Sequence, residues 1–166
     1  MLRPFLATAL LLISSASLAG QKFEAALAQS VVTRLGELAV DRDHDKNVST
    51  LTLDEKKIFE YRDGPMYMSP LIVGAGKEFV LLYRSTGGIA CVGDFLVLEL
   101  KKPLQFSAPF GNCSGSFRAS VEGDTLVVSM PGYVTHPEMF SKADRARIRK
   151  SVDVYLWANG KLTEKK

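Results

Sequence analysis

Oxygen-bearing side chains recur at every second position near the start of the stretch DRDHDKNVSTLT, residues 41–52. They are Asp41, Asp43, Asp45 and Asn47. A short loop with this spacing could gather a hard cation such as calcium, which prefers carboxylate and carbonyl oxygens. The match to an EF-hand loop is incomplete, because Lys46 stands at the glycine position and Thr52 at the position of the bidentate glutamate. We therefore expect a solvated, charged connection and no cofactor, with a weak calcium site as the alternative.

The first nineteen residues have the layout of a secretory signal peptide. Arg3 precedes an apolar run from Phe5 to Ile13, and the small residues Ser17 and Ala19 precede a cleavage point. The run is shorter than the ~20 residues that a membrane span needs. We expect residues 1–19 to be removed and residues 20–166 to form a single periplasmic or secreted domain with no membrane span.

The two cysteines, Cys91 and Cys113, lie in the glycine-rich stretches STGGIACVG and PFGNCSG. Export to an oxidising compartment favours a disulfide between them. Two loops joined in this way would make a rigid surface at one end of a β-fold, where partners are often bound. The alternative is that the disulfide only stabilises a small domain. The candidate partner-binding positions are Thr86, Gly87, Gly88, Ile89, Phe110, Gly111 and Asn112.

A basic cluster near the C-terminus offers a second candidate surface. Arg145, Arg147, Arg149 and Lys150 are opposed locally only by Asp144. The cluster could contact a phosphate or an anionic surface, but a cluster of this kind is more often an ordinary solvated helix face. We include Arg145 and Arg147 among the candidate partner-binding residues.

The remaining chain contains no motif that names a reaction. Tyr133, Tyr155 and Trp157 could form an aromatic platform for a sugar, although aromatic residues on one side of a strand more often fill a core. There is no nucleophile elbow, SxxK or HExxH motif. The formal net charge of the chain is +3, and loss of Arg3 would leave +2, so we expect no nucleic-acid partner. We also do not expect an enzyme.

The elements that would carry these residues are mostly strands. From Ser49 onward apolar residues alternate with polar ones, and turn signals recur at 54–56, 63–65, 74–76, 123–124 and 159–160. A helix is expected over residues 137–150, inserted between the last two hairpins. The sequence predicts a mainly β protein, an antiparallel meander that closes as a sandwich or barrel.

An N-terminal helix is expected before the first strand. Its apolar stripe is Phe23, Leu27, Val31, Leu35 and Leu38, at spacings of four, four, four and three. The competing interpretation is a strand through SVVTRL, where β-branched residues sit together.

Four segments carry a resemblance to known proteins. GGIACVGDFLVLEL, PFGNCSGSF, GDTLVVSMPG and YLWANGKL, within residues 85–162, resemble small exported β-rich proteins of Gram-negative bacteria that have a single disulfide. Some of these proteins are of the periplasmic immunity type. The resemblance implies an inhibitor that occludes an envelope-acting toxin or cell-wall enzyme, and it carries over no catalytic residue. The alternative is a module that binds a small ligand such as a lipid, a sugar or calcium.

Overall fold

The computed structural model of the protein describes residues 22–23, 28–88, 91 and 93–165. The predicted signal peptide and the candidate residue Ile89 lie outside the described residues, so both stay predictions.

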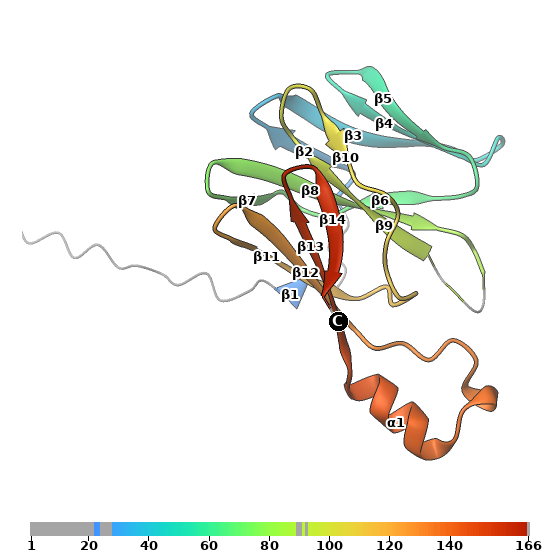
Figure 1. Ribbon diagram of the computed structural model, residues 1–166. Helices are drawn as coiled ribbons and strands as arrows, with labels where there is room; N and C mark the ends of the chain where they lie inside the picture. The colour runs from blue at the N-terminus through green and yellow to red at the C-terminus, as the bar shows by residue number, and fades with distance from the viewer. Residues whose placement is uncertain (1–21, 24–27, 89–90, 92, 166) are drawn as a thin grey trace, which may run out of the picture.

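The described strands form three antiparallel sheets stacked as three layers (Figure 1). The N-terminal sheet contains, in spatial order, β2 (Ser30–Thr33), β3 (Gly36–Asp43), β4 (Val48–Leu53) and β5 (Lys56–Tyr61). The central sheet has the order β10 (Gln105–Phe106), β9 (Gly93–Glu99), β8 (Lys77–Ser85) and β6 (Met66–Met68), and β7 (Ile72–Gly74) also pairs with β8. The C-terminal sheet has the order β1 (Lys22–Phe23), β11 (Phe117–Glu122), β12 (Thr125–Pro131), β13 (Val152–Ala158) and β14 (Lys161–Lys165).

The central sheet is apolar on both faces, and this places the two covering sheets. On β8, Phe79 and Leu81 face the C-terminal sheet, while Val80 and Leu82 face the N-terminal sheet. These four side chains are at most 1% exposed. A strand that is buried on both faces has consecutive apolar residues instead of alternating apolar and polar ones. This explains the sequence FVLL at residues 79–82.

Two hydrophobic cores result, one on each side of the central sheet. The core against the C-terminal sheet contains Ile72, Phe79, Leu81, Phe95, Val97, Phe110, Phe117, Ala119, Leu126, Val128, Met130, Tyr155 and Trp157. The core against the N-terminal sheet contains Leu38, Leu51, Tyr61, Met66, Met68, Val80, Leu82, Leu96, Leu98 and Leu100. Tyr155 and Trp157 share one side of β13 as expected, and that side is core rather than an exposed platform.

A buried polar contact ties the central and C-terminal sheets together. The indole Nε1 of Trp157 donates a hydrogen bond of 2.8 Å to Oε2 of Glu99, whose residue is 4% exposed. The Lys101 ammonium lies 3.4 Å from the other oxygen of Glu99. A buried carboxylate is tolerated only when hydrogen-bonded and paired, and these two groups meet that need.

The predicted N-terminal helix is wrong over its described part, because residues 30–43 form the hairpin of β2 and β3. Residues 34–35 make its turn, and this places Val31 directly opposite Leu38. Two residues seven apart share one face of a helix, but they also pair across a hairpin whose turn lies midway between them. The β-branched run SVVT then favours the strand.

The other elements largely follow the sequence. The protein is mainly β and sandwich-like, the described sheets do not close into a barrel, and the hairpins at 54–55, 123–124 and 159–160 form as expected. The inserted helix is present as a 3-10 turn, η1 (Pro137–Met139), followed by α1 (Lys142–Lys150), capped by the Ser141 side chain. Among the described residues, no helix is long and apolar enough to cross a membrane.

Loss of the contact between the sheets should be measurable as a loss of stability. Trp157→Phe leaves Glu99 without its buried indole donor, and we expect the free energy of unfolding to fall by about 1–3 kcal/mol in urea denaturation. Glu99→Gln keeps a side-chain oxygen that can accept the hydrogen bond from the indole, so it should lower the free energy of unfolding by less than Trp157→Phe does. Equal stability of Trp157→Phe and the wild type would contradict the assigned role.

Alkaline pH should destabilise the fold through its tyrosines. Burial raises the pKa of the Tyr61, Tyr83 and Tyr155 phenols above their ordinary value of about 10. Because the neutral phenol is favoured in the folded state, stability is fully present below the unfolded pKa and is lost as pH rises through the folded pKa. Urea denaturation at increasing pH should show this loss, and Tyr155→Phe should reduce the slope. A slope above pH ~10 that Tyr155→Phe leaves unchanged would exclude the phenol of Tyr155 as a cause.

Candidate partner-binding surface

The disulfide between Cys91 and Cys113 is present and joins two loops at one end of the central sheet. We call this surface the stapled end, and define it as the described residues 85–88, 91 and 110–116. The Cα atoms of Cys91 and Cys113 are 4.7 Å apart. Cys113 has a φ of 68°, so its backbone is in the left-handed region that few side chains adopt.

The first loop of the stapled end is fixed at its root. Arg84 and Asp94 form a two-pronged ion pair with hydrogen bonds of 2.7 and 2.6 Å, and the guanidinium lies 5.2 Å above the ring centre of Tyr61. The Tyr61 hydroxyl donates to the carbonyl of Ser85. The Thr86 hydroxyl donates to the carbonyl of Cys91 at 2.8 Å and so closes the loop.

The described residues after Ser85 in this loop are uncovered. Thr86, Gly87 and Gly88 are all exposed, as predicted for partner-binding positions. Gly87 has a φ of 67°, a conformation that a glycine adopts without strain.

Phe110 is wrongly predicted as an exposed contact, because it is only 7% exposed and belongs to the core. Its backbone exchanges two hydrogen bonds with Phe95, and its ring centre lies 4.9 Å from that of Tyr155. The glycine-rich neighbourhood suggested a surface loop, but a large aromatic side chain gains most from burial. Gly111, next in sequence, is exposed.

Asn112 is half-buried and serves as a clamp rather than a free contact. Its side-chain amide donates to the carbonyl of Pro131 at 2.9 Å and to the Asp153 carboxylate at 2.6 Å. Its own side-chain oxygen accepts from the Ser114 amide at 3.0 Å. Asn112 therefore fixes the second loop to the ends of β12 and β13.

The insertion between β12 and β13 leaves the body of the protein at this clamp. We call residues 133–151 the arm; Figure 1 shows η1 and α1 lying away from the three sheets. The arm closes at its base, where the Gly132 amide donates to the carbonyl of Ser151 at 2.8 Å. A Cβ at Gly132 would collide with the carbonyl oxygen of Ile148, so the end of α1 lies directly against this glycine.

The two arm residues predicted to bind a partner have different roles. Arg145 is half-buried and donates to the carbonyl of Pro137 at 2.9 Å, which joins α1 to η1. Arg147 has a side chain 80% exposed, with Asp144 at 3.1 Å. None of the residues of α1 is buried, so the helix packs on no core.

The four predicted calcium ligands are not gathered around one point. Asp41 and Asp43 lie on β3, and Asp45 and Asn47 lie in the turn that follows it. The Asp43 carboxylate accepts from the Lys46 ammonium at 2.7 Å, and this contact lowers the pKa of that carboxyl. In the part of the chain that the structure describes, no group of three or more acidic, histidine or cysteine side chains could hold a metal. Calcium at this hairpin stays a prediction.

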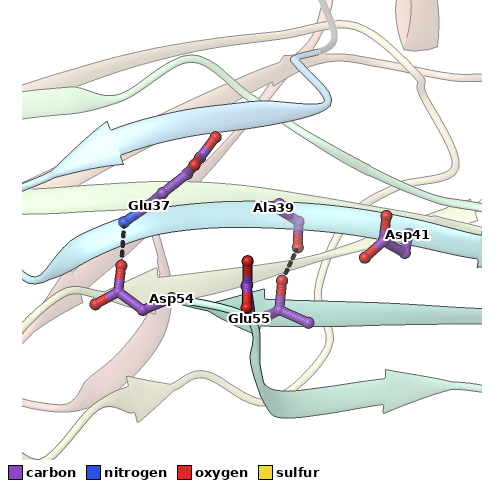
Figure 2. Close-up of a pocket in the computed structure, with 6 residues that line it drawn as sticks. Glu37, Ala39, Asp41, Asp54 and Glu55 are labelled. Carbon is purple, nitrogen blue, oxygen red and sulfur yellow. Dashed lines mark hydrogen bonds between the residues drawn. The ribbon is translucent and has the colours of Figure 1, made fainter.

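Asp41 instead contributes to an acidic depression on the outer face of the N-terminal sheet (Figure 2). The depression is lined by Glu37, Ala39, Asp41, Thr52, Asp54 and Glu55. Asp54 is already engaged, because its carboxylate accepts from the Glu37 amide at 2.9 Å. Figure 2 shows Asp41 and Asp54 at opposite ends of the depression, which makes it a dispersed acidic surface.

Comparison of the chain with family models, curated proteins and solved structures gives no match.

Two features of the site went unrecognised in the sequence. The ion pair of Arg84 and Asp94 joins neighbouring strands, and no spacing rule links residues ten apart in this way. The exposure of α1 did have a signal, because a helix that is polar around most of its circumference has no broad apolar stripe to bury.

The disulfide should contribute substantially to stability. In the chain-entropy model, a bond between residues separated by 22 positions contributes about 3 kcal/mol. We expect Cys91→Ser with Cys113→Ser to lower the free energy of unfolding by roughly this amount, measured by urea denaturation. An unchanged melting temperature of the wild type under reducing conditions would contradict this expectation.

Proposed function

We propose that this protein is a protein-binding module of the bacterial cell envelope, and that it acts as an inhibitor or immunity protein. The stapled end is the contact surface in this proposal. The partner is an envelope-acting toxin or cell-wall enzyme whose active site the stapled end occludes.

The observation that carries the proposal is that the described residues of the stapled end are held in place while several of them stay exposed. The hydrogen bond from Thr86 to Cys91 holds the first loop, the clamp at Asn112 holds the second loop, and the disulfide joins the two. Residues that are already held in place lose little conformational entropy when a partner binds, so more of the contact energy appears as affinity.

The residues that remain exposed suit a close backbone approach. Thr86, Gly87, Gly88, Gly111 and Gly115 offer small side chains or none, and no atom lies within 4 Å of a Cβ built on Gly87 or Gly115. A partner can therefore reach main-chain donors and acceptors that larger side chains would cover.

The experiment is affinity capture from a Gram-negative envelope extract with added secreted toxins, with the oxidised, tagged protein as bait. We expect one stoichiometric protein partner that is retained equally with and without calcium. Gly115→Arg places a long side chain on the stapled end without a steric clash, and it should abolish capture while leaving the melting temperature unchanged.

Ser30→Arg is the matched control, because it makes the same charge change at an exposed position on β2. It should retain the partner. Capture that survives Gly115→Arg would exclude the stapled end as the contact surface. Capture that requires calcium would instead implicate the hairpin that carries Asp41 to Asn47.

A second candidate function, small-ligand binding, is favoured by a groove of about 370 Å³ beside β6. Tyr67, 37% exposed and stacked on Tyr83, lines it together with Arg42 and His44. An aromatic ring beside polar donors suits a ligand such as a sugar. A small molecule that co-purifies with the wild type, and not with Tyr67→Ala, would support this function.

A further inference from the structure

The positive charge of the protein is concentrated in the arm. Lys142, Arg145, Arg147, Arg149 and Lys150 are opposed within α1 only by Asp144, so this helix has a formal charge of +4. The whole chain has a formal net charge of +3, and the residues outside α1 therefore sum to −1. The field of the molecule is thus strongly asymmetric, with α1 as its positive end.

Burial divides α1 into two sides of opposite character. Asp144, Arg145 and Ile148 are half-buried and lie on the side toward the rest of the arm. The fully exposed residues are Lys142, Ala143, Ala146, Arg147, Arg149 and Lys150. The solvent side of the helix therefore presents four cations, two alanines and no acid. We call Lys142, Arg147, Arg149 and Lys150 the cationic face.

The single acid of α1 pairs with only one of the four cations of this face. The Asp144 carboxylate accepts from the Ser141 hydroxyl at 2.7 Å and from Arg147 at 3.1 Å, and α1 contains no second acid to oppose Lys142, Arg149 and Lys150. Apolar residues flank the helix at both ends, with Met139 76% exposed before it and Val152 59% exposed after it.

The arm is too small to be a protein interface by itself. A helix of nine residues is roughly 14 Å long, whereas a stable protein–protein contact buries ~1,000 Å² or more. The exposed side of α1 offers only Ala143 and Ala146 as apolar residues, and these are not the large aromatic or aliphatic anchors that such contacts depend on. Binding to an extended anionic surface requires neither a large buried area nor apolar anchors. The affinity for such a surface rises with each cation that comes within its electrostatic field.

We propose that the arm is a peripheral contact for anionic lipid headgroups, with the cationic face toward the surface and Met139 entering the headgroup layer. Each cation near such a surface raises the partition coefficient about five-fold. Four cations and one flexible apolar side chain support reversible adsorption, not insertion. The stapled end, held beside the base of the arm by Asn112, is then presented close to the membrane.

The test is sedimentation with vesicles, using the purified protein with its N-terminus defined by mass spectrometry. Phosphatidylcholine vesicles with about one third phosphatidylglycerol are compared with pure phosphatidylcholine vesicles. We expect binding only to the anionic vesicles, and we expect it to fall steeply as salt rises from ~0.1 M to ~0.5 M. Equal binding to both kinds of vesicle would overturn the proposal.

Variants separate the arm from general electrostatics. Arg147→Glu with Arg149→Glu should weaken binding about 30-fold or more, because two cations are lost and two anions are added. Lys56→Glu with Lys57→Glu makes the same charge change on β5, in the sheet farthest from α1 in Figure 1, and should have little effect. Equal weakening by the two pairs would contradict a specific role for the arm.

Two further measurements complete the test. Met139→Ser should weaken vesicle binding a few-fold and leave its salt dependence unchanged. All variants should keep the wild-type melting temperature, because none of the altered side chains is buried. Binding of soluble polyglutamate or heparin without binding of anionic vesicles would show that the arm recognises another polyanion. Salt-dependent self-association in place of vesicle binding would show that it recognises a second copy of the chain.

Discussion

The central sheet is apolar on both faces, and it must be covered on both. Phe79 and Leu81 on one face of β8, and Val80 and Leu82 on the other, lose contact with water only when two further sheets pack against them. The chain meets this requirement with its N-terminal hairpins on one side and its C-terminal hairpins on the other (Figure 1). The covering sheets can then keep polar outer faces, such as the acidic depression that contains Asp41.

This arrangement decides where function can reside. The spaces between the layers are filled by two hydrophobic cores, so the surfaces that we propose for recognition are the stapled end, the groove beside β6 and the arm. The stapled end and the arm meet at Asn112, which belongs to the stapled end and binds Pro131 and Asp153, two residues outside the arm on either side. A protein contact at the stapled end and a lipid contact at the arm would therefore share one anchor, and we infer that the geometry between them is fixed at that point.

The sequence predicted local pairings better than tertiary placement. The alternation within β11 and β12 and the turn at 159–160 depend on neighbouring residues, and both were correct. The N-terminal helix failed because Val31 and Leu38 satisfy a helical spacing and a cross-strand pair equally well. The strand is favoured over the helix because Leu38 packs against β4 and the central sheet. These contacts are distant in sequence, so no local pattern contains that information.

In the candidate site, too, local features were predictable and tertiary contacts were not. The disulfide was predictable from two cysteines and an expected export signal, and the exposure of Thr86 to Gly88 from their position in a glycine-rich stretch. The burial of Phe110 and the clamp at Asn112 were not, because both depend on β12 and β13, which follow later in the chain. The helix of the arm was expected in its place, but its separation from the body depends on the absence of a broad apolar stripe rather than on any motif.

The central claim is that a two-faced central sheet holds the body together and that the arm lies outside it. Amide hydrogen exchange measures this directly, residue by residue. The account predicts that the amides of β8 and β9 exchange only through global unfolding, while those of α1 exchange orders of magnitude faster. Protection of α1 equal to that of β13 would show that the arm is part of the packed body and would contradict the account.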